Sequence, residues 1–239
     1  MLDSIKNMKL VIVTPFYEMK GWSPYIRSLV ESIIFICRHT NIYVDFWNLS
    51  GDSYVDRARN ALAHQFKNSS FTDMLFIDSD MGWTIEGLTK LLAADVDVVG
   101  AGYPCKNMWD FYGCLLHVDK DQRPITNKHG LIKASSLPTG FMKIRQGVFQ
   151  RLDAFFPNDC YIGDGPKDDK IVIGNYFGRI QPLGEDVSFC RRWTEAGGEL
   201  WVEPNITISH YGVKDYTGNY YEFLCSCPGG SHDPNRGAV

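Results

Sequence analysis

The sequence predicts a single α/β domain with a doubly wound, mostly parallel central sheet. The chain has 239 residues, 44% of them hydrophobic, which is enough for one large core. Short apolar segments alternate with segments whose apolar residues recur at helical spacing, a pattern typical of parallel strands joined by helices. The uniformly apolar residues 74–77 also match a strand that is covered on both faces.

The first hundred residues carry most of this alternation. An apolar run predicts a first strand that ends at Pro15, and Ser23 followed by Pro24 predicts the start of a helix. The second expected strand shows alternating apolar residues, and the helix after it has apolar residues three or four positions apart. The expected strands cover residues 9–14, 41–48, 74–77 and 97–103, and the expected helices begin near residues 23 and 53 and cover residues 84–93.

After Pro104 the pattern becomes mixed. A long polar loop at residues 119–130 interrupts it, and the segment beyond residue 224 is rich in proline and glycine without core residues. We therefore expect one domain over residues 1–224 and a disordered tail over residues 225–239. The strand-like segments of this half cover residues 112–118, 141–144, 170–173 and 205–209, and its expected helices cover residues 147–154 and 185–196.

The composition argues against several classes of protein. A formal net charge of -4 gives no overall attraction to nucleic acid or anionic lipid. The longest apolar segment, residues 29–37, is shorter than the roughly 20 residues of a membrane span, and the N-terminus lacks a signal-peptide core. We expect no membrane insertion and a cytoplasmic location, in the host cell if the protein is viral. The seven cysteines are expected to be free thiols, and Cys225 and Cys227 alone are too few ligands for a zinc site.

Two carboxylates follow the predicted third strand, in the sequence MLFIDSDM. Ligands of parallel sheets bind beyond the carboxyl ends of the strands. Residues i and i+2 of an extended chain point to the same side, so Asp78 and Asp80 are expected to bind one Mn²⁺ or Mg²⁺ shared with phosphate oxygens. The alternative is that both residues only cap the helix predicted from Thr84, but the long apolar strand before them favours a metal site.

Two later segments could complete such a site. Glu185 and Asp186 begin a predicted helix, where acidic residues also occur simply because they complement the helix dipole. His210 closes an apolar run, and a single histidine is more often structural. Together with a D-x-D motif, however, an imidazole supplies a third ligand that suits manganese.

The ordered set of motifs resembles the GT-A glycosyltransferases. The D-x-D motif, the later Glu185-Asp186 pair and the late H-x-G motif at His210 occur in the order that this family shows. Thr14-Pro15 after the first strand, the A-R-N segment at residues 58–60 and the T-G-F-M segment at residues 139–142 are also similar to the family. The resemblance covers roughly residues 9–218.

This resemblance implies a stand-alone bacterial or phage-type enzyme that uses a nucleotide-sugar donor. Residues 1–104 would form the donor half and residues 105–224 the acceptor half. The resemblance implies that Mn²⁺ or Mg²⁺ is held by Asp80 and His210, with Asp78 reaching the metal or the ribose. Donor contacts are expected from the following residues: Thr14, Pro15, Tyr17, Arg57, Arg59, Asp78, Ser79 and Lys106.

The resemblance also implies an inverting displacement, with Asp186 as the general base and Glu185 contacting or orienting the acceptor. The acceptor would bear a hydroxyl group on a polysaccharide, a protein or a hydroxymethylated DNA base. A DNA acceptor is suggested by four basic residues in and beside the middle loop, although acidic residues lie among them: Lys120, Arg123, Lys128 and Lys133.

Two other functions compete with transfer. A haloacid-dehalogenase-like phosphatase would use Asp78 as a nucleophile with Mg²⁺, and the acidic residues 163–169 resemble a late motif of that family. However, Asp78 follows the third predicted strand rather than the first, and this function leaves His210 without a role. The other alternative is a non-catalytic module that binds nucleotide sugars without consuming them.

Overall fold

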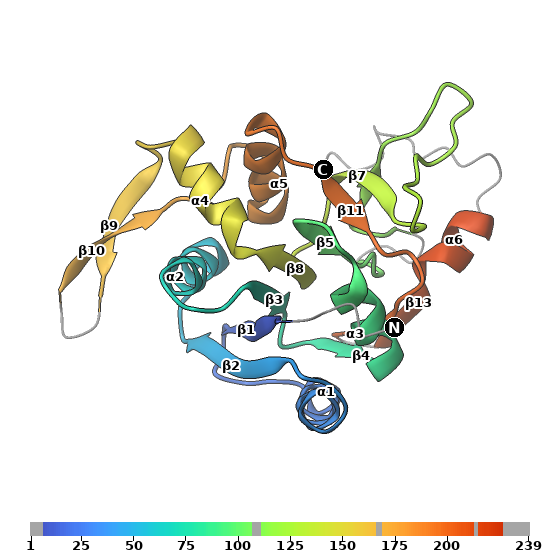
Figure 1. Ribbon diagram of the computed structural model, residues 1–239, viewed down its shortest axis with the longest axis horizontal. Helices are drawn as coiled ribbons and strands as arrows, with labels where there is room; N and C mark the ends of the chain where they lie inside the picture. The colour runs from blue at the N-terminus through green and yellow to red at the C-terminus, as the bar shows by residue number, and fades with distance from the viewer. Residues whose placement is uncertain (1–6, 107–110, 166–168, 213–214, 227–239) are drawn as a thin grey trace.

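The computed structural model describes residues 7–106, 111–165, 169–212 and 215–226, and it contains an eight-stranded sheet between two layers of helices (Figure 1). The strand order is β2-β1-β3-β8-β5-β11-β7-β6. The strands are β1 (Lys9–Phe16), β2 (Tyr43–Ser50), β3 (Asp73–Ile77), β5 (Val98–Gly100), β6 (Leu115–Leu116), β7 (Ile132–Ser136), β8 (Phe141–Arg145) and β11 (Leu200–Val202).

Most strands of this sheet run in one direction. β1 is parallel to β2 and to β3, and β5 is parallel to β11. β8 lies antiparallel between β3 and β5, and β7 is antiparallel to both β11 and β6, so these two strands alone are reversed in this sheet. The prediction of an α/β fold with a mostly parallel central sheet is therefore confirmed.

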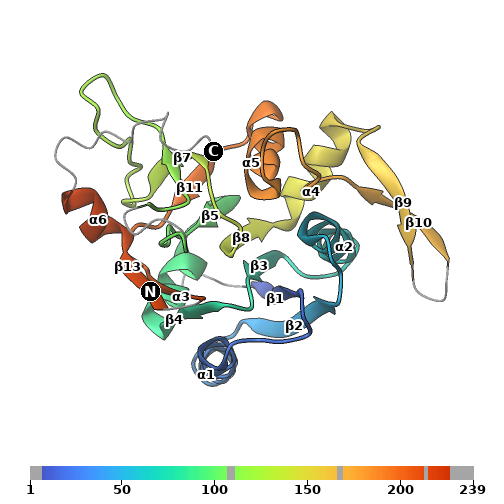
Figure 2. The same ribbon diagram turned by 180° about the vertical axis from the view of Figure 1, so that it is seen from behind.

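Helices cover both faces of the sheet (Figures 1 and 2). α1 (Ser23–His39) and α3 (Ile85–Ala93) pack on one face, and α2 (Val55–Lys67), α4 (Gln146–Phe155) and α5 (Glu185–Glu195) pack on the other. α1 buries Tyr25, Leu29, Ser32 and Ile36, which share one side of a helix because they are three or four residues apart. Alternate residues of β1 enter the two hydrophobic clusters on either side of the sheet, as expected for a fully covered strand.

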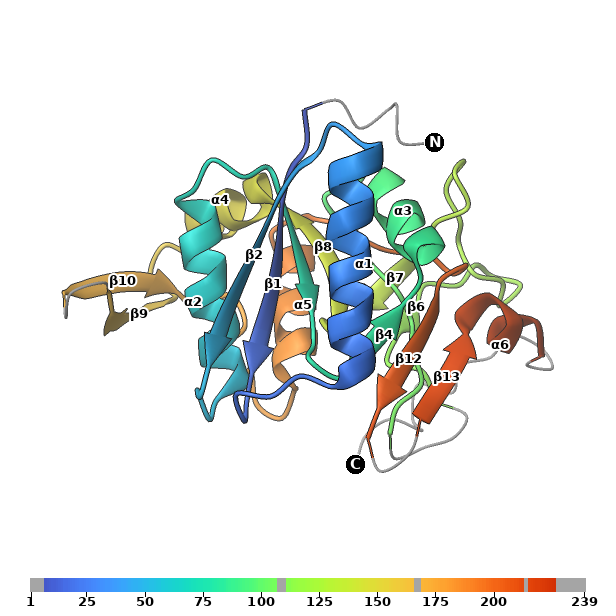
Figure 3. The same cartoon turned by 90° about the horizontal axis from the view of Figure 1, so that it is seen from below.

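A second sheet brings the last part of the chain to the end of β3. Its order is β13-β12-β4, formed by β4 (Met81–Trp83), β12 (Thr207–Tyr211) and β13 (Asp215–Asn219), and α6 (Tyr220–Ser226) follows (Figure 3). His210 lies opposite Met81 in the antiparallel pairing of β12 with β4. The chain therefore passes from β3 of the main sheet into β4 of the small sheet, and the pairing of β12 with β4 places His210 beside the D-x-D motif.

A β-hairpin projects from the opposite side of the molecule (Figures 1 and 2). It consists of β9 (Cys160–Asp164) and β10 (Lys170–Gly174), and it carries the described part of the acidic segment at residues 163–169. β10 contacts α2, so the hairpin lies beside that helix.

Several sequence predictions differ from the structure. Of the strand predicted at residues 112–118, only Leu115–Leu116 form a strand, β6, while Tyr112 and Val118 form isolated β-bridges. The strand predicted at residues 97–103 spans only residues 98–100. The helix expected near residue 147 is confirmed as α4, and α5 begins at Glu185 as predicted. Cys225 belongs to α6, whereas Cys227 and the remaining predicted tail lie outside the described residues. None of the described helices is long and apolar enough to cross a membrane.

Candidate active site

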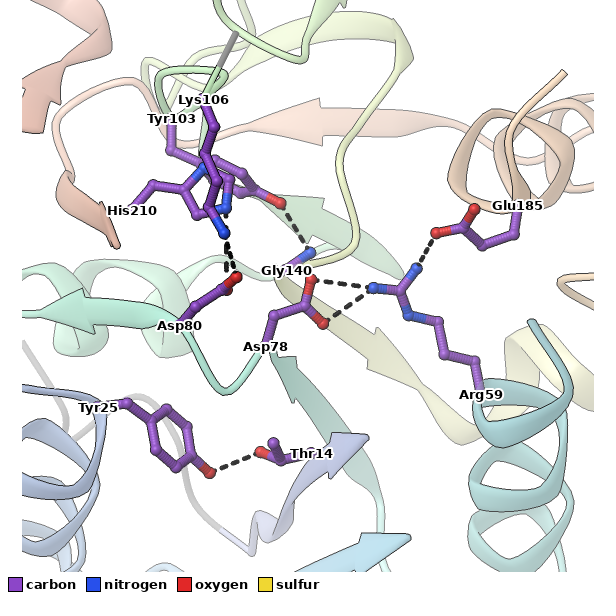
Figure 4. Close-up of polar contacts among 10 residues, drawn as sticks. All are labelled: Thr14, Tyr25, Arg59, Asp78, Asp80, Tyr103, Lys106, Gly140, Glu185 and His210. Atoms are coloured by element: carbon purple, nitrogen blue, oxygen red, sulfur yellow. Dashed lines mark hydrogen bonds and ion pairs between the residues drawn. The ribbon is translucent and has the colours of Figure 1, made fainter. Parts of the chain in front are cut away.

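The D-x-D motif occupies a tight turn at the carboxyl end of β3. The Asp78 amide donates to Gly140 O (3.1 Å), and the Met81 amide donates to Asp78 O (3.1 Å), which closes the turn before β4. The expectation of an extended backbone that directs both carboxylates to one side is therefore wrong. Figure 4 shows that Asp78 points toward Arg59, whereas Asp80 points toward Lys106 and His210.

Asp80 and His210 face each other with unprotonated atoms. His210 Nδ1 lies 2.9 Å from Pro104 O, and because a carbonyl only accepts, Nδ1 carries the proton and Nε2 keeps its lone pair. Nε2 lies 3.8 Å from Asp80 Oδ1, which has no hydrogen-bond partner among the described residues. Burial lowers the pKa of His210, so the ring is neutral near pH 7. Two electron-pair donors thus meet with no proton between them.

Lys106 supplies the positive charge beside this pair. Its ammonium donates to Asp80 Oδ2, the second oxygen of the same carboxylate. The lysine stem passes over Gly212, where a Cβ atom would lie only 3.1 Å from Lys106 Cδ. The glycine of the H-x-G motif therefore makes room for a cation next to the D-x-D turn.

A buried arginine joins the first aspartate to α5. Arg59 Nη2 lies 2.9 and 3.0 Å from the two oxygens of Asp78, and Nη1 lies 2.5 Å from Glu185 Oε1. Only 4% of the Arg59 side chain is exposed. Burial opposes its charge, but Asp78 and Glu185 outweigh this effect and raise the pKa of the guanidinium. Arg59 thus ties the end of β3 to the start of α5.

Gly140 allows this close packing. A Cβ atom at this position would lie 2.4 Å from the Tyr103 hydroxyl oxygen, 2.6 Å from Met81 Cε and 2.9 Å from Asp78 Oδ2. The Gly140 amide donates to the Tyr103 hydroxyl (3.0 Å), and the Tyr103 ring contacts the His210 ring edge to face. The T-G-F-M segment therefore supports Asp78 directly and His210 through Tyr103.

Asp186 lies one residue beyond Glu185 in the first turn of α5. Its Oδ1 accepts from the Val187 amide (2.7 Å). Burial, followed by the charge of Glu185, raises the pKa of the Asp186 carboxyl above its ordinary value. A raised pKa makes a carboxylate a better proton acceptor, so Asp186 has the property that a general base requires.

The remaining predicted donor contacts lie in different environments. Thr14 is fully buried and shares a 2.7 Å hydrogen bond with the Tyr25 hydroxyl, so its hydroxyl is already engaged. Pro15 follows it and is half-buried, and Tyr17 is 68% exposed on the loop after β1. Ser79 accepts through its carbonyl from the Trp22 amide (2.9 Å).

Arg57 lies apart from Arg59 and points outward. It forms two hydrogen bonds with the Asp52 carboxylate, at 2.7 and 2.8 Å, and 57% of its side chain is exposed. Of the two arginines near the A-R-N segment, Arg59 alone contacts the D-x-D turn. The sequence did not separate the two residues, because both follow the start of the same helix.

Two side chains of the described residues could bind a divalent ion together. No three described His, Cys, Asp or Glu side chains are grouped so that they could hold a metal ion by themselves. Asp80 Oδ1 and His210 Nε2 are the available pair, and Pro104 O orients the imidazole as the outer hydrogen bond of a metal-binding histidine does. Mg²⁺ and Mn²⁺ sites on phosphate substrates commonly use one or two protein carboxylates plus phosphate oxygens and water. Asp78 as a further ligand remains a prediction.

Three supporting residues were not predicted as part of the site. Tyr103 was expected to pack in the core, Trp22 was not singled out, and Gly140 was noted only as part of the T-G-F-M segment. Their roles depend on contacts between segments that are distant in the sequence. The one available signal was the glycine directly before a strand-like segment, because glycines often mark a close approach of side chains or backbone.

Comparison with known proteins supports the fold. Neither a protein-family model nor a curated protein matches the sequence. Among solved structures, A197 from STIV superposes with a TM-score of 0.54 at 15% identity, covering 86% of each chain. A crystal structure of GalNAc-T7 with UDP, GalNAc and Mn²⁺ superposes with a TM-score of 0.52 at 13% identity. The chain has a GT-A-like fold. The match covers 92% of this chain but only 48% of GalNAc-T7, about half the length of that chain.

Proposed function

We propose that this protein is a metal-dependent glycosyltransferase that moves a sugar from a nucleotide-sugar donor to an acceptor hydroxyl. The observation that carries the proposal is the pair formed by Asp80 Oδ1 and His210 Nε2, two acceptors on half-buried side chains, 3.8 Å apart with no proton between them. The pair lies at the carboxyl end of β3, where open α/β sheets bind their ligands. The GT-A-like fold and the neighbour crystallised with UDP and Mn²⁺ support the same choice.

Asp80 and His210 would hold Mn²⁺ or Mg²⁺ together with diphosphate oxygens of the donor. The bound ion supplies positive charge that stabilises the departing diphosphate. Lys106 adds a second positive charge at the same place, because its ammonium contacts Asp80. The half-buried Pro15, near the end of β1, and the exposed Tyr17, on the loop after β1, are proposed to contact the nucleoside.

Asp186 is proposed as the general base that removes the proton from the acceptor hydroxyl in an inverting displacement. Its raised pKa and its place on α5 support this role. Glu185 is held by Arg59 at 2.5 Å and is therefore the less available of the two acids. We propose that Glu185 and Arg59 position the start of α5, so that Asp186 can face the acceptor.

The phosphatase alternative has weaker support. Both oxygens of Asp78 accept from Arg59, so the carboxylate is held by a buried cation and is poorly suited to attack phosphorus. Asp164, from the acidic segment that suggested this function, lies on the β9–β10 hairpin and pairs with Lys170. A DNA acceptor gains no support from Lys133, because its ammonium pairs with Glu199 at 2.6 Å.

The test measures nucleotide binding and donor consumption. We expect one nucleoside diphosphate to raise the melting temperature of the protein only when Mn²⁺ is present, because a ligand at 100 times its Kd adds about 2.7 kcal/mol of stability. Asp80→Asn and His210→Ala should lose this response. Asp164→Asn, on the distant hairpin, is the matched control and should keep it.

Three results would contradict the proposal. No nucleotide response with Mn²⁺ in the wild-type protein would remove its basis. Phosphate release from a simple phosphomonoester would favour the phosphatase instead. A metal-dependent response without consumption of any nucleotide sugar, in the presence of polysaccharide or protein acceptors, would identify a binding module.

A further inference from the structure

A groove lined by none of the proposed metal-binding or catalytic residues runs beside the D-x-D turn. It lies between the first three turns of α1 and the small sheet, and it has a volume of about 460 Å³. This volume is within the usual range of small-molecule sites, roughly 300–1,000 Å³. Its lining is rich in hydroxyl groups, contributed by Ser23, Ser28, Thr84, Thr207, Ser209 and Tyr211. Four of these hydroxyls, those of Ser28, Thr84, Thr207 and Ser209, also make one hydrogen bond or more within the protein, and a hydroxyl can take part in up to three.

The ring of Tyr211 lines this hydroxyl-lined groove, and a second ring stacks on it. The Tyr211 ring lies against Gly82, where a Cβ atom would come within 2.9 Å of Tyr211 Cε2. Trp22 stacks on Tyr211, with 6.1 Å between the ring centroids and 23° between the ring planes. Trp22 is 45% exposed, so part of this stacked pair is open to solvent. The missing side chain of Gly82 thus allows a flat aromatic surface to form there.

Backbone hydrogen bonds attach these rings to the proposed catalytic centre. The Trp22 amide donates to Ser79 O (2.9 Å), and the Tyr211 amide donates to Asp80 O (2.8 Å). Tyr211 also follows His210 directly in β12. A chain-like molecule that leaves the D-x-D turn on this side would therefore pass over the rings and enter the groove.

The charges of the groove favour a neutral ligand. Its lining contains one cation, Arg27, and one anion, Glu31, and these pair with each other at 2.8 Å. A nucleic acid would require several unpaired cations to contact its phosphates. The groove instead suits a ligand that has many hydroxyls and apolar ring faces. The hydroxyl groups of the lining can form hydrogen bonds with the ligand's hydroxyls, and the aromatic rings can pack against its apolar faces.

We propose that this groove binds a neutral oligosaccharide, and that the acceptor of the transferase is the end of such a chain. The second part of the proposal rests on the proposed function. Trp22 and Tyr211 would hold one sugar ring next to the D-x-D turn, and the hydroxyl-lined part would hold the following units. Polysaccharide is thereby favoured over protein and DNA as the class of acceptor.

Saturation-transfer NMR on the full chain tests the proposal, with maltotriose, cellotriose and chitotriose as the probes. We expect at least one trisaccharide to bind, and to remain bound when UDP and Mn²⁺ are added. Trp22→Ala and Tyr211→Ala should each weaken binding roughly two- to twelvefold, because one aromatic contact contributes about 0.5–1.5 kcal/mol. Tyr211→Phe keeps the ring and should bind nearly as well as wild type.

Tyr43→Ala is the matched control, because Tyr43 is 63% exposed on the edge strand β2, outside the groove. The proposal is overturned if no trisaccharide binds, or if binding is unchanged in both Trp22→Ala and Tyr211→Ala. Displacement of the trisaccharide by UDP with Mn²⁺ would also overturn it, since the sugar would then occupy the donor site. Trisaccharide binding without any nucleotide response would instead contradict the transferase and leave the groove intact.

Discussion

Replacing Gly140 by alanine tests the packing beneath the proposed catalytic centre. The new methyl group would lie 2.4 Å from the Tyr103 hydroxyl oxygen, 2.6 Å from Met81 Cε and 2.9 Å from Asp78 Oδ2. Met81 can move its methyl group, but Tyr103 is buried and Asp78 is held by Arg59. The methyl group can therefore be accommodated only if the tyrosine or the D-x-D turn shifts.

The expected cost follows from two contributions. Overpacking of a well-filled core costs about 1–3 kcal/mol. A shift of Tyr103 would also break its hydrogen bond with the Gly140 amide, which contributes about 1 kcal/mol. Gly140→Ala should therefore lower the free energy of unfolding by about 2–4 kcal/mol.

Gly147→Ala provides the matched control in the same region of the chain. Gly147 lies in the first turn of α4, and nothing is found within 4 Å of its added Cβ atom. The same chemical change should therefore be neutral there or stabilise the protein by up to about 1 kcal/mol. Urea unfolding of both variants gives the two free energies. If the free energies of unfolding of Gly140→Ala and Gly147→Ala differ by less than about 0.5 kcal/mol, the close contacts described around Gly140 are wrong.

Three further predictions concern charged residues. Arg59→Met should lower the free energy of unfolding by about 3–5 kcal/mol, because it leaves two partly buried carboxylates unpaired. Arg57→Met, at an exposed ion pair, should lower it by at most about 1 kcal/mol. Equal losses in urea unfolding would contradict this difference. Asp186→Asn should keep the nucleotide response and lower sugar transfer by about 10²–10⁴-fold, and transfer at the wild-type rate would exclude it as the base. Burial lowers the pKa of Lys143 to about 8, below its ordinary 10.5, so the unfolded chain binds more protons between these pH values and stability should rise with pH across them. The wild-type protein should gain on the order of 3 kcal/mol over this range relative to Lys143→Met, and a constant difference between the two proteins would refute the titration.

The sequence predicted the elements that have a long periodic pattern. α2 and α5 were found because their apolar residues recur at helical spacing, whereas β1 was found from its apolar run and α1 from the start signal at Ser23 and Pro24. β4 and β11 were missed because three residues are too short to show a period, and β9 was missed because it alternates outside the main core. The place of β8 between β3 and β5 depends on pairing across the fold, which a single sequence does not reveal.

The sequence indicated some of the residues that the structure brings together, but it did not indicate how their side chains are directed. Asp80 and His210 do lie side by side, because both occur at strand ends, where ligand-binding residues gather. The opposite directions of Asp78 and Asp80 were not predicted, since a strand pattern gives no sign of the turn that follows it. The link from Arg59 to Glu185 joins residues 126 positions apart, and no local pattern records such a contact.

The pairing of β12 with β4 also has a consequence for protein synthesis. His210 pairs with Met81, so about 130 residues separate the two strands that complete the proposed metal site. At roughly 5–20 residues per second, a ribosome needs about 6 to 26 seconds to make this intervening chain. During that interval Asp80 has been made and His210 has not. The nascent protein therefore acquires both proposed metal-binding side chains only after β12 emerges, and donor binding would report the arrival of that strand.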